Sequence, residues 1–201
     1  MMIQEIMVSE AVSAEIHEVY AMALEPEDFL RATGELFARC DSAWKQAKKA
    51  KTSVDRPIAD FLAAGIVHLD ALDLCSLSAE MMPAIVSMLI SIDMSGVDEK
   101  KLGHLFLELH VRMLKACIKF ARECSGDDYA EPHANEILFH EASLFVETFG
   151  DKKGLTPQVE GLLHGCTHYI NDKADRTERP MLRPAERLVD IFARLHAINN
   201  Y

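Results

Sequence analysis

Two histidines in the last quarter of the chain have the spacing of a metal-ligand pair. His164 and His168 are four residues apart, so a helix of 3.6 residues per turn carries both imidazoles on one side. Imidazole nitrogens bind Zn²⁺ and iron, and a third ligand from elsewhere in the fold would complete such a centre. The pair therefore indicates a zinc or iron site, as the alternative to a protein that binds no cofactor.

Two glycines lie beside these histidines. Gly161 and Gly165 are also four residues apart, and helical geometry places them on the side that carries the imidazoles. A glycine inside a helix costs about 1 kcal/mol relative to alanine. The pattern favours a backbone that something approaches closely: another helix, a second copy of the chain, or a ligand. The other alternative is an exposed face that tolerates glycine.

A histidine and a glutamate are predicted to face the interior. His110 falls within the apolar arc of its helical segment, and Glu141 falls between Leu138 and Leu144. A buried carboxylate has to be paired, hydrogen-bonded or neutral, because removing a charge from water is costly. We therefore predict that Glu141 meets His110 or a basic residue in the core. Such a pair has either a structural role or an acid–base or ligand-binding role.

Two further pairs with the same spacing are predicted to face solvent. His104 and Glu108 fall opposite the apolar stripe of their segment, on a side that also carries Lys101, Arg112, Lys115 and Lys119. Glu136 and His140 likewise fall opposite the stripe of the next segment. Neither pair is therefore expected to bind a ligand.

The motifs that mark common enzymes do not occur. The sequence contains no GxGxxG, GxxxxGK[ST], HExxH or GxSxG motif, and no glutamate stands three residues before a histidine. The last absence removes the di-iron carboxylate bundle, which needs Glu-x-x-His on two helices. These absences favour a protein without catalytic activity, although a catalytic group assembled in space from distant residues would leave no local motif.

The elements that position these residues are all helical. Apolar residues recur at helical spacing in eight segments that begin at about residues 10, 26, 57, 79, 98, 132, 157 and 184. Prolines open several of them, and Gly126 and Gly150 follow two of them as stop signals. No segment reads as a strand. We predict an all-α fold: a single compact domain of about eight helices over residues 1–201, the last of which (about 184–198) docks loosely or exchanges with a partner chain.

Composition narrows the function further. The chain has 201 residues, 49% of them hydrophobic, and a formal net charge of −11. Nucleic-acid binding and adhesion to anionic membranes both need a basic surface, so neither is expected. The longest charge-free apolar segment, 81–92, is shorter than the roughly 20 residues that span a bilayer. Five cysteines, an odd number, and no secretory signal predict reduced thiols in the cytoplasm.

These observations favour an acidic protein-interaction or regulatory module that forms a homodimer and binds a basic partner protein. The alternative is a metal-dependent or small-ligand-binding helical enzyme that uses His164 and His168. A further alternative is an acidic mimic, because residues 123–151 hold eight acidic residues and no Lys or Arg. Such a mimic would occupy the nucleic-acid groove of a basic protein.

Overall fold

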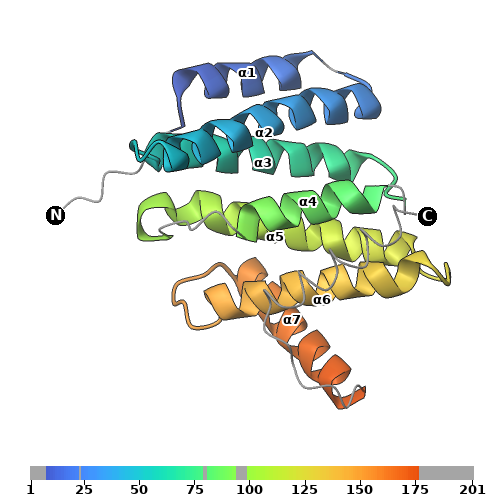
Figure 1. Ribbon diagram of the computed structural model, residues 1–201. Coiled ribbons are helices and arrows are strands. Elements are labelled where there is room, and N and C mark those ends of the chain that lie inside the picture. Colours follow the sequence, from blue (N-terminus) through green and yellow to red (C-terminus); the bar gives the residue numbers. More distant parts are fainter. Residues whose placement is uncertain (1–7, 23, 79–80, 94–98, 177–201) are drawn as a thin grey trace. The chain divides into compact units, whose positions relative to one another are not determined.

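The computed structural model describes residues 8–22, 24–78, 81–93 and 99–176 (Figure 1). This part of the chain is helical and contains no strand, which confirms the all-α prediction. The helix expected at about 184–198 lies outside the described residues. No helix in the described ranges is long and apolar enough to cross a membrane. The seven described helices are α1 (Glu10–Ala21), α2 (Pro26–Lys49), α3 (Asp55–Leu74), α4 (Met82–Asp93), α5 (Glu99–Glu123), α6 (Ala130–Phe149) and α7 (Pro157–Arg176).

Contacts group the chain into two compact units. Unit 1 consists of Met1–Leu77 and Ser91–Ala116, and unit 2 consists of Ser78–Ile90 and Cys117–Tyr201. Each unit has its own buried apolar residues. The expectation of one domain stays a prediction.

The core of unit 1 forms where α2 packs along α3. The ring of Phe61 lies 5.9 Å from that of Trp44 and 5.2 Å from that of Phe37. Gly65 lets the N-terminal part of α5 approach α3, because a Cβ at this position would lie only 2.9 Å from Cδ1 of Leu109. Both Phe61 and Leu109 are fully buried. Burying side chains of this size contributes about 1.5–3 kcal/mol each.

In unit 2, α6 and α7 pack against each other. The rings of Phe139 and Tyr169 are 6.3 Å apart, and the Tyr169 hydroxyl donates a hydrogen bond of 3.3 Å to the Asn135 carbonyl. Burial raises the pKa of Tyr169 to about 12. The inner side of α7 is apolar, with Val159, Cys166 and Ile170 buried, as its sequence pattern predicts.

Two helices begin two residues before the proline that was expected to open them. The first residue of α3 is Asp55 rather than Pro57, and that of α6 is Ala130 rather than Pro132. A proline is tolerated anywhere in the first turn, where a backbone N–H has no partner inside the helix. Asp127 stabilises the earlier start of α6, because its Oδ1 accepts hydrogen bonds of 2.9 Å from the backbone of residues 129 and 130. Those bonds lower the pKa of Asp127.

The fifth helix is not continuous, although its apolar spacing predicts one helix over about 98–124. Gly103 interrupts α5 with φ +42° and ψ −115°, a backbone conformation that favours glycine. Periodicity cannot reveal such a break, because the residues on either side keep the helical pattern.

Candidate functional site

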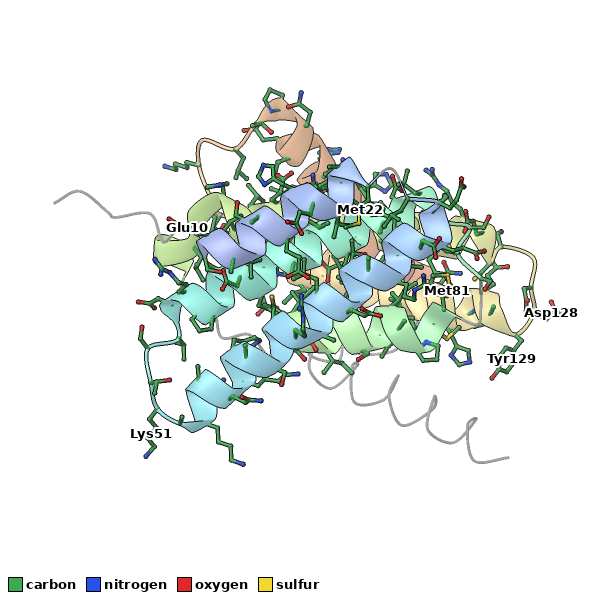
Figure 2. The ribbon with its side chains drawn as sticks, turned by 90° about the horizontal axis from the view of Figure 1, so that it is seen from above. Glu10, Met22, Lys51, Met81, Asp128 and Tyr129 are labelled. Carbon is green, nitrogen blue, oxygen red and sulfur yellow. The ribbon has the colours of Figure 1, made fainter. Side chains whose placement is uncertain are left out.

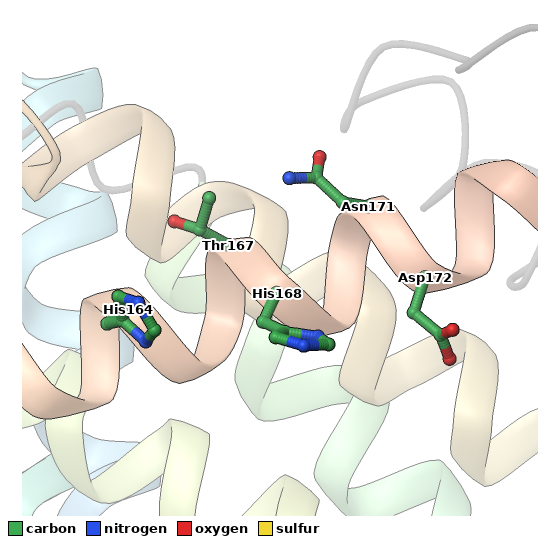
Figure 3. Close-up of a pocket in the computed structure, with 5 residues that line it drawn as sticks. All are labelled: His164, Thr167, His168, Asn171 and Asp172. Carbon is green, nitrogen blue, oxygen red and sulfur yellow. The ribbon is translucent and has the colours of Figure 1, made fainter.

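The two histidines of α7 lie beside a pocket. His164 and His168 are exposed and line a cavity of about 350 Å³ together with Thr167, Asn171 and Asp172 (Figure 3). The helix that carries them begins at Pro157, where the Thr156 hydroxyl accepts a hydrogen bond of 3.4 Å from the backbone N–H of Val159. The helix therefore begins where the sequence predicts, and both histidines lie on its exposed side as predicted.

The described residues contain no group of three His, Cys, Asp or Glu side chains poised around one metal position. The zinc or iron prediction therefore depends on His164 and His168 alone. Each residue that lines the pocket carries a polar group, which can bind water, a metal ion or a small polar ligand.

The two glycines of α7 are open to space among the described residues. A Cβ on Gly161 or on Gly165 would meet nothing within 4 Å. No helix in the described part of the chain approaches these positions. A helix outside the described residues, a second copy of the chain, a ligand and a tolerant exposed face remain as the alternatives.

This openness predicts that alanine substitutions at the α7 glycines and at Gly65 change the free energy of unfolding by different amounts. Gly161→Ala and Gly165→Ala should each raise the free energy of unfolding by up to about 1 kcal/mol, because alanine is the better helix former. Gly65→Ala should stabilise less than either, because its Cβ would lie 2.9 Å from Leu109 Cδ1 and 3.3 Å from Phe37 Cε2. Urea unfolding followed by circular dichroism measures all three. Destabilisation by either α7 substitution would show that a close neighbour covers this face.

His110 and Glu141 both face the interior, as predicted, and are 1% and 0% exposed. The ring of His110 meets that of Phe106 edge-on, with the centroids 4.5 Å apart. Glu141 lies in unit 2 near two buried thiols. Burial raises the pKa of Cys117 well above its usual value and that of Cys166 to about 11, and the charge of Glu141 adds to both shifts. Because His110 belongs to unit 1, the pairing of these two residues stays a prediction.

One prediction about α6 is wrong. His140 is fully buried and Glu136 is half-buried, whereas both were expected to face solvent. Residues 139–142 are all buried, and at about 100° per residue they cover most of the helix circumference. The side of α6 opposite its main apolar stripe is therefore covered as well. His104 and Glu108, the other pair, are exposed as predicted.

A polar network joins three helices of unit 1, and sequence spacing identified only part of it. Arg112 of α5 forms the expected ion pair with Glu108, and its Nε also donates a hydrogen bond of 2.6 Å to Asp70 of α3. Asp70 in turn accepts a hydrogen bond of 2.8 Å from the hydroxyl of Tyr20 in α1. Burial, together with that hydrogen bond, raises the pKa of Tyr20 to about 12.

Three large apolar side chains are exposed around one end of this network. Tyr20, Met22 and Leu74 are 50%, 60% and 62% exposed, and we call them the Tyr20 patch. Tyr20 and Met22 lie at the end of α1, where Figure 2 labels Met22, and Leu74 is the last residue of α3. The Cys75 thiol donates a hydrogen bond of 3.5 Å to the Pro26 carbonyl, so the end of α3 lies against the start of α2.

Acidic residues surround the Tyr20 patch. The exposed acids on the adjoining turns and helix ends are Glu18, Glu25, Glu27 and Asp73. The nearby basic groups are neutralised, because Arg31 is paired with Asp28 and Arg112 with Asp70 and Glu108. The patch is thus an apolar surface within a negative field. The amino-acid composition predicts the negative charge of this surface. The apolar centre could be recognised only from the three-dimensional contacts.

The acids of residues 123–151 lie in different environments. Glu141 is buried, and Glu131 accepts a hydrogen bond of 2.7 Å from the backbone of Gly126. Asp127 caps α6, while Glu147 lies two residues before the C-terminal end of that helix. The exposed members are Glu123, Asp127, Asp128, Glu147 and Asp151. The acidic-mimic alternative stays a prediction.

His68 is a half-buried polar residue that sequence reasoning missed. Its Nδ1 lies 3.0 Å from the Thr33 hydroxyl oxygen, and its ring stacks on Phe37 with centroids 5.8 Å apart. Thr33 is fully buried, and its hydroxyl also lies 2.9 Å from the Phe29 carbonyl oxygen. Burial lowers the pKa of His68 from 6.5 to about 4. The imidazole is therefore neutral at pH 7.

Comparison with protein-family models, with curated proteins and with solved structures finds no match to this chain. Its function has to be inferred from its own residues.

Proposed function

We propose that this chain is a protein-interaction module without catalytic activity. In this proposal the Tyr20 patch binds a partner segment that carries both apolar and basic side chains. The observation that carries the proposal is the gathering of Tyr20, Met22 and Leu74, each at least half exposed, at one end of unit 1. Large exposed apolar side chains at one end of a unit are candidates for a binding site, because apolar surface patches mark such sites.

The chemistry of the patch defines the partner. Tyrosine and methionine are enriched at interfaces, because a rigid ring gives contact area and a thioether adapts to the partner's shape. The surrounding carboxylates favour Lys or Arg at the edge of the partner segment and speed its association. The network through Asp70 and Arg112 fixes Tyr20 in place, so little side-chain entropy is lost on binding.

A display selection tests this proposal. Random peptides are selected against the tag-free protein, and the recovered peptides are measured by fluorescence anisotropy. We expect them to combine Lys or Arg with large apolar residues, and to bind more weakly as the salt concentration rises. The variant Met22→Ser/Leu74→Ser should weaken binding about tenfold or more, the loss typical of interface residues that dominate affinity.

Tyr129→Ser is the matched control, because Tyr129 is also about half exposed (54%) but belongs to unit 2. It should leave the peptide affinity unchanged. Recovered peptides that are not basic, or that bind the patch variant as well as the native protein, would contradict the proposal. Loss of binding in the Tyr129 variant would place the interface at the turn before α6 instead.

A homodimer and a cytoplasmic location belong to the same proposal. The five free cysteines support a reducing compartment. We predict that light scattering coupled to size-exclusion chromatography gives a mass of twice the 22.5 kDa of one chain. A mass of one chain at high protein concentration would remove the dimer.

A further inference from the structure

The two histidines of α7 belong to a different unit of the chain from the Tyr20 patch. They belong to unit 2, and both are exposed beside the pocket of about 350 Å³. Figure 3 shows His164, His168 and Asp172 along one side of the helix, with Thr167 and Asn171 on another side.

Helical geometry brings the two imidazoles within reach of one ion. Residues four apart on a helix have Cβ atoms about 5–6 Å from each other. A metal–nitrogen bond is about 2.0–2.1 Å long, so rotation of the two side chains alone lets one nitrogen of each ring meet at a single metal position. The backbone of α7 does not have to move.

The ring nitrogens are available for such a bond. Neither His164 nor His168 has a hydrogen-bond or ion-pair partner in the part of the chain that the structure describes. The hydroxyl of Thr167, between them in sequence, is used within the helix and donates a hydrogen bond of 2.9 Å to the Leu163 carbonyl. A metal ion would therefore displace no contact of the fold.

We propose that His164 and His168 together bind one borderline divalent transition-metal ion, with Zn²⁺ as the reference. Imidazole suits such ions, whereas Mg²⁺ and Ca²⁺ prefer oxygen ligands. With two protein ligands, the remaining coordination positions face the pocket, where water or a small anion fills them. Asp172 lies on the same side of the helix as the two histidines and lines the same pocket. The affinity is weaker than that of a closed four-ligand site.

Calorimetric titration of the tag-free full chain with zinc chloride, in a buffer free of chelators, tests the proposal. We expect one ion per chain. His164→Ala and His168→Ala should each weaken binding about tenfold or more, because a single imidazole remains. His104→Ala is the matched control, since His104 is an exposed histidine on another helix, and it should leave the dissociation constant unchanged.

A second measurement excludes the thiols and a folding defect. Cys75 is the one cysteine that is not buried, so the titration is repeated in a Cys75→Ser background, where the same binding is expected. Zn²⁺ should also raise the melting temperature of the native chain, because it binds the folded state, but should leave that of the His164→Ala/His168→Ala variant unchanged. Circular dichroism without metal establishes that this variant is folded.

Three results would overturn the proposal. The first is the absence of zinc binding by the native chain. The second is binding that survives the double histidine substitution. The third is binding that disappears with Cys75→Ser. None of them bears on the Tyr20 patch, so this site and the interaction surface succeed or fail independently.

Discussion

Replacing Trp44 with alanine is expected to lower the free energy of unfolding by about 3–5 kcal/mol, the cost of removing a large aromatic side chain from a core. Trp44 is 2% exposed, and its ring lies 5.9 Å from that of Phe61. The Lys48 ammonium lies 5.1 Å from the centre of the indole. The alanine variant therefore loses both the buried surface and a cation–π contact.

Trp44→Phe is the informative control. Among the described residues the indole nitrogen has no hydrogen-bond partner, so phenylalanine keeps most of the packing and gives up no hydrogen bond. We expect it to cost less than about 1.5 kcal/mol. Urea unfolding followed by circular dichroism compares both variants with the native chain. An equal loss of the free energy of unfolding in the two variants would mean that the stabilisation comes from the edge of the indole rather than from its volume. Because Trp44 is the chain's single tryptophan, native-state fluorescence reports on unit 1 alone.

Acidification is expected to destabilise the protein by on the order of 3 kcal/mol through His68. Burial lowers the pKa of this imidazole from 6.5 to about 4 in the folded state. Below pH 6.5 the unfolded chain takes up a proton that the folded chain does not. The contribution of His68 is thus fully present above pH 6.5 and is lost as the pH falls toward 4.

His68→Gln removes this titration, so its stability should fall less steeply than that of the native chain between pH 6.5 and 4. The quantity to compare is the slope, because the substitution also loses the contact with Thr33 at every pH. His17→Gln is the control, since His17 is exposed on α1, and it should keep the native slope. Parallel pH profiles for the native chain and His68→Gln would show that the imidazole is charged within the fold.

Features that depend on one helix could be predicted from the sequence. Helical periodicity identified the described helices, and the geometry of one turn placed His164 and His168 side by side on α7. The same geometry correctly predicted that His110 and Glu141 face the interior. In each case the deciding quantity is an angle about a single helix axis, which residue spacing determines.

Features that depend on two helices could not be predicted in this way. His68 is partly covered because its ring packs against Thr33, Gly34 and Phe37 of α2; a Cβ on Gly34 would lie 3.2 Å from that ring. His140 is buried because α6 is covered on more than its apolar stripe. The hydrogen bond from Arg112 to Asp70 joins residues that are 42 positions apart in the sequence, so no local sequence pattern predicts it. The Tyr20 patch was missed for the same reason.

The order of the two units along the chain constrains how this protein can be divided or recombined. Unit 1 is built from two separate segments, with Ser78–Ile90 of unit 2 between them. A fragment ending at Leu77 would keep α1, α2 and α3 but would lack Leu109 and Arg112, so apolar surface beside Gly65 and the carboxylate of Asp70 would be exposed. No single boundary in the gene separates the units. Any continuous fragment that contains the whole of one unit therefore also contains a segment of the other.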